Sequence, residues 1–346
     1  MILESNSNNV RSISLLQGVL RLNILITGGA GYIGSNIYLA LFKNGFNPII
    51  VDNFSESAES RITELEKLTE HEVSYANCDI ADIEDMTDIL NDWKIDAVVH
   101  AAGFKTVSES VNEPLKYYKN NVAGIINLLI AMRHADVKKI VFSSSASVYG
   151  NPKELPVTEE APTNPVSPYG RSKLQCENII RDTVSANSGW SAISLRYFNP
   201  IGKDKSGLLD DFSNGNINNL YDALKEVLNG NLDHLNIFGK DYDTIDGTAV
   251  RDFIHITDLA NGHVSALNAV LNSENHYDTF NLGCGNGVSI LELKSMFEEK
   301  FQKKIPFEFQ PNRPGDIAVN YADISKAQRI LKWSPELQLD GSKIQI

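Results

Sequence analysis

The chain has 346 residues, of which 42% are hydrophobic and 22% charged; this is the composition of a globular protein and excludes a disordered or fibrous one. Its length calls for two lobes or one enlarged α/β domain. Because 44 Asp and Glu oppose 31 Lys and Arg, the formal net charge is −13, and binding to nucleic acid or to an anionic membrane is not expected.

Short apolar runs alternate with stretches of helical periodicity once the chain has passed residues 1–21, a predicted N-terminal extension without a targeting signal. We expect strands at 23–27, 47–52, 97–100 and 139–143, and helices at 33–44, 114–134 and 169–186. Such alternation predicts an α/β fold of the Rossmann type, a doubly wound parallel sheet with helices on both faces.

A change of composition marks a second part of the chain. From about residue 199 to 247 it is rich in Asn, Asp and Gly and loses the strand–helix rhythm. We therefore assign residues 22–199 to the Rossmann domain, to which residues 251–275 return with a helix near 257–270. Residues 200–250 and 276–346, with a helix near 290–301, are expected to form a smaller mixed α/β lobe that binds the substrate.

The three cysteines are far apart in the sequence. Cys78, Cys176 and Cys284 form no CxxC pair, so neither a disulfide framework nor a metal site is predicted. This usage fits a reducing, cytoplasmic location.

A glycine-rich turn follows the first predicted strand. Gly28, Gly31 and Gly34 let the backbone approach a pyrophosphate, and the amides that open the next helix attract its charge. Asp52 and Asn53 end the second strand, where an acid meets the ribose diol of NAD and would repel the 2′-phosphate of NADP. Asp79 suits an adenine contact or, alternatively, a helix cap. The alternative for the whole pattern is a structural turn with a strand-end aspartate.

Tyr169 and Lys173 are four residues apart and therefore share one face of a predicted helix. A nearby cation is expected to lower the pKa of the phenol, so that Tyr169 takes the proton of a sugar hydroxyl while hydride leaves for nicotinamide. Ser145, at the end of a strand, would add a hydroxyl beside the same substrate oxygen. An exposed helix pair and a turn-forming serine are the alternatives.

Ten ordered motifs extend these patterns over nearly the whole chain from residue 21: TGGAGYIGSN, VDNF, HAAGFKTVSESVNEPLKYYKNNVAG, FSSSASVYG, SPYGRSK, RYFNPIG, NINNL, DGTAVRDFIH, NLGCGNG and RPGD. With them the sequence resembles the extended short-chain dehydrogenase/reductase family and, within it, the UDP-glucose 4-epimerases. The resemblance implies tightly bound NAD, a UDP-sugar substrate, and a homodimer packed through the helices at 114–134 and 169–186, whose apolar stripes could equally be internal core.

The same resemblance implies the site residues. Ser145, Tyr169 and Lys173 would carry the chemistry. Around NAD, in addition to Tyr169, Lys173 and the glycines and acids above, it places Tyr32, Ile33, Ile80, Ala102, Gly103, Lys105, Asn120, Ser143 and Phe198. Around the UDP-sugar, in addition to Ser145 and Tyr169, it places Lys105, Asn199, Asn219, Leu220, Asn236, Ile237, Phe238, Arg251, Arg313, Asp316 and Asn320. Two arginines are also what a pyrophosphate needs, since each guanidinium can grip two oxygens.

Departures from relatives narrow the function. Ser145-Ala146-Ser147 lacks the acidic neighbour that a dehydratase places there, and Cys284, in a glycine turn, is a poor nucleophile for oxidation at C6. Asn320 is smaller than the tyrosine found in some relatives and would leave room for an N-acetyl group, so a UDP-N-acetylglucosamine or dual-specificity 4-epimerase is an alternative. A noncatalytic NAD-binding sensor is the alternative of another class.

Overall fold

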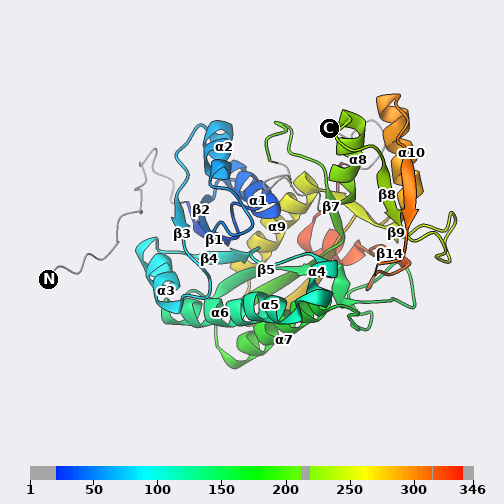
Figure 1. Cartoon of the computed structure of the whole chain (residues 1–346). Coiled ribbons are helices and arrows are strands. Elements are labelled where there is room, and N and C mark those ends of the chain that lie inside the picture. The colour runs from blue at the N-terminus through cyan, green and yellow to red at the C-terminus, as the bar shows by residue number, and fades with distance from the viewer. Residues whose placement is uncertain (1–20, 210, 212–218, 314, 338–346) are drawn as a thin grey trace.

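The computed structural model describes residues 21–209, 211, 219–313 and 315–337 (Figure 1). The extension expected at 1–21 lies outside the described residues except for Arg21, as does the tail from residue 338. The described residues form a seven-stranded sheet in which every neighbouring pair is parallel. Its order is β11 (His276–Leu282), β6 (Ser191–Tyr197), β5 (Lys139–Ser145), β4 (Ala97–His100), β1 (Asn23–Thr27), β2 (Asn47–Asp52) and β3 (Tyr75–Asn77).

Two helical layers cover the sheet because its central strands are apolar on both faces. In β1, Ile24 and Ile26 join the core on one side, while Leu25 joins the core on the other. The first layer holds α1 (Tyr32–Lys43), α2 (Ser60–Thr69) and α9 (Ile256–Leu271), and the second holds α3 (Ile83–Asp92), α6 (Gly124–His134) and α7 (Pro168–Ala186) (Figure 1). The predicted Rossmann-type fold is confirmed.

The helix expected at 114–134 contains a wider turn. After α4 (Val107–Asn112), helix α5 (Pro114–Tyr117) passes into the π-helical turn η1 (Tyr118–Ala123) and then into α6. The extra residue of a π turn is frequently found at functional sites. Here η1 carries Asn120, which was predicted to contact NAD.

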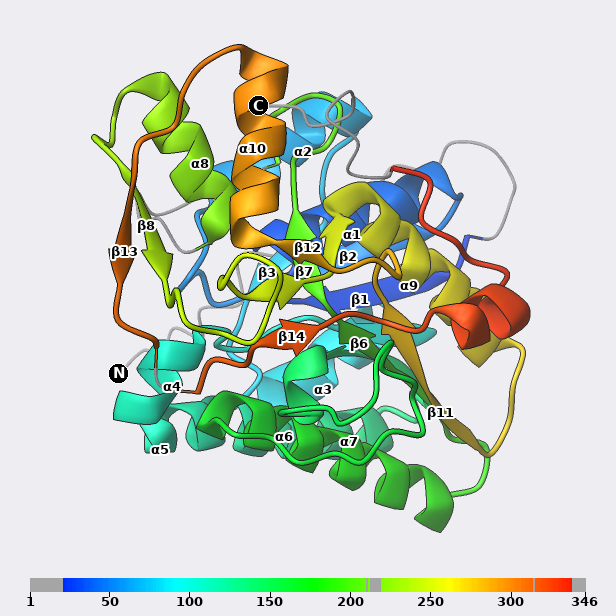
Figure 2. The same cartoon turned by 90° about the vertical axis from the view of Figure 1, so that its right-hand side faces the viewer.

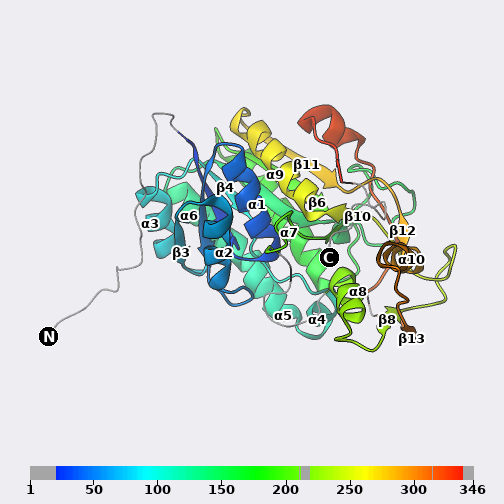
Figure 3. The same ribbon diagram turned by 90° about the horizontal axis from the view of Figure 1, so that it is seen from above.

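A smaller part stands beside the sheet (Figures 2 and 3). Helices α8 (Leu220–Asn229) and α10 (Ile290–Phe301) share a core with β8 (Leu235–Phe238), which pairs in parallel with β13 (Phe307–Gln310). Short strands connect it to the sheet: β7 (Asn199–Ile201) with β10 (Phe253–His255), and β9 (Val250–Arg251) with β12 (Val288–Ser289) and β14 (Val319–Asn320). The turns η2 (Ala146–Val148) and η3 (Ala327–Leu331) complete the elements of the described residues.

The smaller lobe was expected to resume at residue 276, but the structure places the residues that follow in the large sheet. Residues 276–282 were assigned to the smaller lobe, but as β11 they pair with β6 along its whole length and form one edge of the sheet. A parallel partner is set by contacts distant in sequence, which composition does not reveal. Among the described residues, no helix is both long and apolar enough to cross a membrane.

Candidate active site

The turn between β1 and α1 is built by glycines. Gly28 has φ +67°, and a Cβ there would lie 2.7 Å from the Cα of Ala102 in the neighbouring loop. A Cβ on Gly34 would lie 2.1 Å from the carbonyl oxygen of Gly28. Within the described part of the chain, no side chain caps the first amides of α1, whose N-cap is Gly31. The turn thus packs too tightly for side chains and leaves the helix amides available to an anion.

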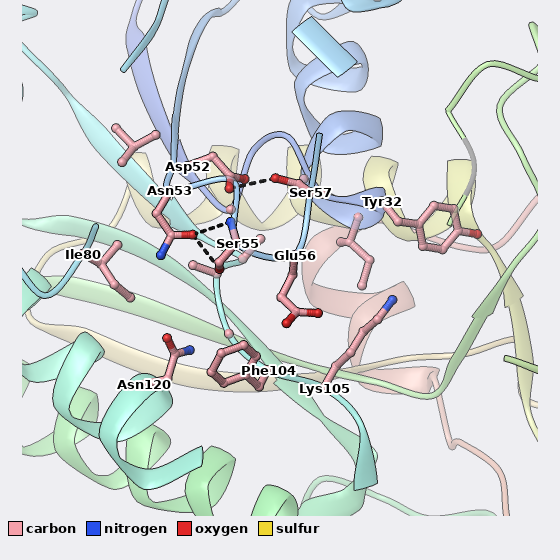
Figure 4. A pocket seen from close by; sticks show the side chains of 18 of the residues that line it. Tyr32, Asp52, Asn53, Ser55, Glu56, Ser57, Ile80, Phe104, Lys105 and Asn120 are labelled. Atoms are coloured by element: carbon pink, nitrogen blue, oxygen red, sulfur yellow. Dashed lines mark hydrogen bonds between the residues drawn. The ribbon is translucent and has the colours of Figure 1, made fainter. Parts of the chain in front are cut away.

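This turn forms one wall of a cavity of about 510 Å³ at the carboxyl ends of β1, β2 and β4 (Figure 4). A ligand site is expected there, because the strand order reverses direction between β1 and β4. The lining comprises Gly28, Gly31, Tyr32, Ile33, Gly34, Val51, Asp52, Asn53, Ser55, Glu56, Ser57, Cys78, Asp79, Ile80, Ala101, Ala102, Gly103, Phe104, Lys105, Thr106, Glu109, Asn120 and Asp211.

Asp52 is held in one orientation at the cavity wall. Its carboxylate accepts hydrogen bonds from the backbone N–H of Ala30 (3.0 Å) and of Phe54 (2.9 Å) and from the Ser57 hydroxyl (2.9 Å). A carboxylate offers about four acceptor positions, so one remains for a ribose hydroxyl. Asn53 donates to Asp79 at 2.8 Å and ties the ends of two neighbouring strands together.

Tyr169, Ser145 and Lys173 are brought together where β5 meets α7. Ser167 caps α7 by accepting from the Gly170 amide at 3.1 Å, and Pro168 occupies its first turn. Ser145 is near enough to Tyr169 to lower the pKa of its phenol, and the Lys173 Nζ donates to the Ser143 carbonyl oxygen at 2.8 Å. As predicted, Tyr169 and Lys173 lie on one helix, α7, four positions apart and so on one face of it. The Lys173 ammonium on this face reaches the end of β5.

The electrostatics of this group differ from the expectation. Burial raises the pKa of Tyr169 above its usual value, and the Ser145 side chain only partly opposes this. Burial also lowers the pKa of Lys173 to about 8, against the charge of nearby Glu177. The sequence pattern predicted a lowered pKa for Tyr169; this was wrong for the structure as described, because loss of water penalises the phenolate more than its surroundings stabilise it.

A second polar group lies around β9 and β14. Arg251 forms an ion pair with Asp316 at 2.9 Å, and in the register of the two strands it faces Asn320. The guanidinium of Arg313 lies 3.5 Å from the centroid of the Phe238 ring on β8. The structure thus gathers five of the residues predicted to bind the UDP-sugar.

Lys105 connects the cavity with the smaller lobe. Its ammonium binds both carboxylate oxygens of Asp211, at 2.6 and 2.9 Å, and the Asn219 amide donates to the same carboxylate at 2.8 Å. Asn219 is also the N-cap of α8, which begins at Leu220. Asn199, on β7, pairs with Phe253 of β10.

The comparisons with known proteins agree with this geometry. A family model described as GDP-mannose 4,6 dehydratase matches residues 25–342. UDP-glucose 4-epimerase of Bacillus subtilis is 45% identical over 317 residues, which cover 92% of this chain and 93% of the relative. The crystal structure of UDP-glucose 4-epimerase from Bifidobacterium longum, in complex with NAD+ and UDP, has a TM-score of 0.89 at 43% identity and covers 92% of this chain and 95% of its own.

This chain belongs to the UDP-glucose 4-epimerase family. A further member, from Stenotrophomonas maltophila with bound NAD and formylated UDP-arabinopyranose, is 40% identical with a TM-score of 0.89, covering 94% of this chain and 96% of its own. The UDP-Glc/GlcNAc 4-epimerase of Campylobacter jejuni is 35% identical with a TM-score of 0.78, covering 92% and 95%. The family predicted from the ten motifs is confirmed.

The lining of the cavity includes most, but not all, of the residues predicted to contact NAD. Ser143, Tyr169, Lys173 and Phe198 lie outside its lining, as do all the predicted sugar-site residues except Lys105. Sequence reasoning missed the lining residues Val51, Ser55, Glu56, Ser57, Cys78, Ala101, Phe104, Thr106, Glu109 and Asp211. A serine-rich turn directly after Asp52-Asn53 was the available signal for Ser55 to Ser57; Asp211 had none. The roles of individual residues stay predictions.

Proposed function

We propose that this chain is an NAD-dependent 4-epimerase of UDP-hexoses that interconverts UDP-glucose and UDP-galactose. One observation carries the proposal: Ser145, Tyr169 and the Lys173 ammonium, which donates to the Ser143 carbonyl oxygen, come together at the end of β5, beyond a glycine-walled cavity. A hydroxyl pair of this kind suits the removal of a proton from a sugar hydroxyl.

The cavity fits NAD. The clearances at Gly28 and Gly34 admit backbone and no side chain, which is what a pyrophosphate lying against the turn requires, and Asp52 has an acceptor position free for a ribose diol. When bound, NAD supplies a reversible hydride acceptor next to the sugar C4. Because the hydride returns to the sugar, a tightly bound dinucleotide needs no second substrate.

The chain's own residues hold the substrate and move its proton. Tyr169 takes the proton of the 4-hydroxyl as C4 loses its hydride, and returns it when hydride re-enters on the opposite face of the 4-keto sugar. Ser145 hydrogen-bonds the same oxygen, and Lys173 favours the phenolate. Burial raises the pKa of Tyr169 and favours its protonated form, and the positive charge of a bound nicotinamide would favour the phenolate. Arg251 and Arg313 bind the diphosphate.

An epimerase is favoured over its alternatives by particular residues. The 4,6-dehydratase activity in the name of the matching family model needs an acidic neighbour of the catalytic hydroxyl, and Ser145 is followed by Ala146 and Ser147. A noncatalytic NAD sensor would have no physical need for the buried Tyr169 and Lys173.

The choice of sugar depends on Asn320. Its side chain is 6% exposed, and its Oδ1 has no hydrogen-bond partner among the described residues. A buried acceptor of this kind favours a ligand donor such as an N-acetyl N–H. We therefore propose some activity on UDP-N-acetyl sugars, as the name of the Campylobacter jejuni relative states for that protein.

The assembly and location belong to the same proposal. Leu115 on α5 is 79% exposed and Ile126 on α6 is 40% exposed, which supports a homodimer through this helical face. Ile125 and Leu128 of the same helix are buried in the core, so the apolar stripe serves both purposes. Cys78, Cys176 and Cys284 are all free thiols, in keeping with the cytoplasm. We also propose the division into a Rossmann domain and a substrate lobe, with β11 assigned to the Rossmann domain.

The test uses purified full-length protein incubated with UDP-galactose and no added NAD, with products resolved by chromatography. We expect UDP-glucose to form, and Tyr169→Phe to abolish this while retaining bound NAD, measured after denaturation. Tyr277→Phe is the matched control, because its hydroxyl bonds with Ser194 away from the site. Conversion of UDP-N-acetylgalactosamine alone would keep the epimerase mechanism but make the N-acetylated sugar the substrate. Absence of conversion of both sugars would favour the noncatalytic NAD-binding sensor.

A further inference from the structure

The Tyr242 hydroxyl is a buried polar group without a hydrogen-bond partner among the described residues. The rest of the side chain is half-buried, so the polar end is the one that faces inward. A buried hydroxyl that lacks a partner costs free energy, and native structures retain one mainly where a ligand or water completes it. The feature therefore calls for an occupant.

The loop that carries Tyr242 fixes the position of its ring. A Cβ on Gly239, which has φ +85°, would lie 2.3 Å from the ring, so the ring fills the space left by that glycine. The Tyr242 amide donates to the Gly247 carbonyl oxygen at 3.0 Å, and the Thr244 hydroxyl donates to the Thr248 carbonyl oxygen at 2.6 Å. The hydroxyl is thus held in place before any ligand arrives.

Two guanidinium groups and one carboxylate act electrostatically on this hydroxyl. They belong to Arg251, Arg313 and Asp316, the ion-paired group around β9 described above. Burial raises the pKa of Tyr242, the Asp316 charge adds to this, and the two arginines oppose it. At neutral pH the phenol keeps its hydrogen and is a donor.

We propose that Tyr242 is a further substrate-binding residue, whose hydroxyl donates to an oxygen of the nucleotide diphosphate alongside Arg251 and Arg313. This rests on the proposed function, which brings a nucleoside diphosphate to the two arginines. Phosphate oxygens only accept hydrogen bonds, so they match a protonated phenol on which two cations act. The uracil and ribose have no comparable need for the pair of positive charges.

The experiment measures the affinity of the NAD-containing full-length protein for UDP and for uridine by titration calorimetry. In Tyr242→Phe, which removes only the hydroxyl, we expect UDP to bind about 10- to 100-fold more weakly, the usual cost of a lost hydrogen bond to a charged group. Uridine affinity should stay unchanged, because uridine has no phosphate. Tyr277→Phe should alter neither affinity.

Each other result overturns the proposal. Equal UDP affinity in Tyr242→Phe and the unsubstituted protein would show that water, not the diphosphate, is the hydrogen-bond partner of the Tyr242 hydroxyl. An equal loss for UDP and uridine would place the contact on the nucleoside, or show that the loop has moved. Because binding is measured without turnover, absence of epimerisation would count against the proposed function while leaving this result readable.

Discussion

Replacing Glu177 by Gln tests what holds the catalytic helix against the sheet. Glu177 lies on α7, two turns beyond Tyr169, and is 3% exposed, while Arg196 on β6 is 6% exposed. Their side chains form two parallel bonds: Arg196 Nη2 to Oε2 at 2.7 Å and Arg196 Nε to Oε1 at 3.0 Å. The Ser144 hydroxyl also donates to Oε1, at 2.5 Å.

The expected cost follows from burial. Glu177→Gln leaves the Arg196 charge buried opposite a neutral amide, and such a loss destabilises by about 3–5 kcal/mol. This loss is a large part of the free energy of unfolding of a typical folded protein, which is about 5–15 kcal/mol. The double variant Glu177→Met with Arg196→Met removes both charges, leaving Ser144 and Tyr149 short of partners at about 1–3 kcal/mol. We expect the double variant to be more stable than the single one.

Urea denaturation followed by tryptophan fluorescence measures both variants, since Trp190, at the base of β6, is 3% exposed and will report its loss of burial. The kcat of the single variant should fall as well, because α7 also positions Tyr169 and Lys173. The reasoning is refuted if Glu177→Gln costs less than about 1 kcal/mol, or if the double variant loses the sum of the two single losses.

Three further predictions concern the site. Gly34→Ala should abolish retention of NAD, because its Cβ would meet the Gly28 carbonyl oxygen at 2.1 Å, whereas Gly31→Ala, with its nearest atom at 3.3 Å, should retain much of it; bound NAD released by denaturation measures both. The kcat should fall as pH rises through about 8, since the buried Lys173 loses its proton there and the favourable charge with it; a kcat flat to pH 10 would contradict this. Asn320→Tyr should reduce kcat/KM for UDP-N-acetylgalactosamine by about tenfold or more while sparing UDP-galactose, and equal effects on both would argue against a steric role.

Apolar runs bounded by turn residues predicted four of the seven strands of the sheet, whereas β3, β6 and β11 were not predicted as strands. Residues 23–27, 47–52 and 97–100 form strands with the expected bounds, and 139–143 extends by two residues into the serines. The helix at 290–301 has its expected bounds, while the helix expected near 257–270 begins one residue earlier, at Ile256, where His255 caps it. Local patterns determined these elements because each is set by its own side chains.

Contacts between distant residues could not be predicted in the same way. The addition of β11 to the sheet, the Glu177–Arg196 pair and the inward hydroxyl of Tyr242 all depend on elements that meet only in the folded chain. The pKa of Tyr169 failed for a related reason: the sequence shows the neighbouring cation but not the extent to which the helix and strand exclude water. The spacing in the sequence predicted that Tyr169 and Lys173 share a helix face, whereas burial in the folded protein determines the direction of the pKa shift of Tyr169.

The late position of β11 has a consequence for how the protein is made. Translation must pass residue 282 before the sheet can close, and until then β6 presents an unpaired edge of residues that end up buried. Nascent or truncated chains are therefore open to edge-to-edge association during this interval. It also follows that no single cut between residues 199 and 276 separates a finished nucleotide-binding half from the rest, because the last strand always remains on the other fragment.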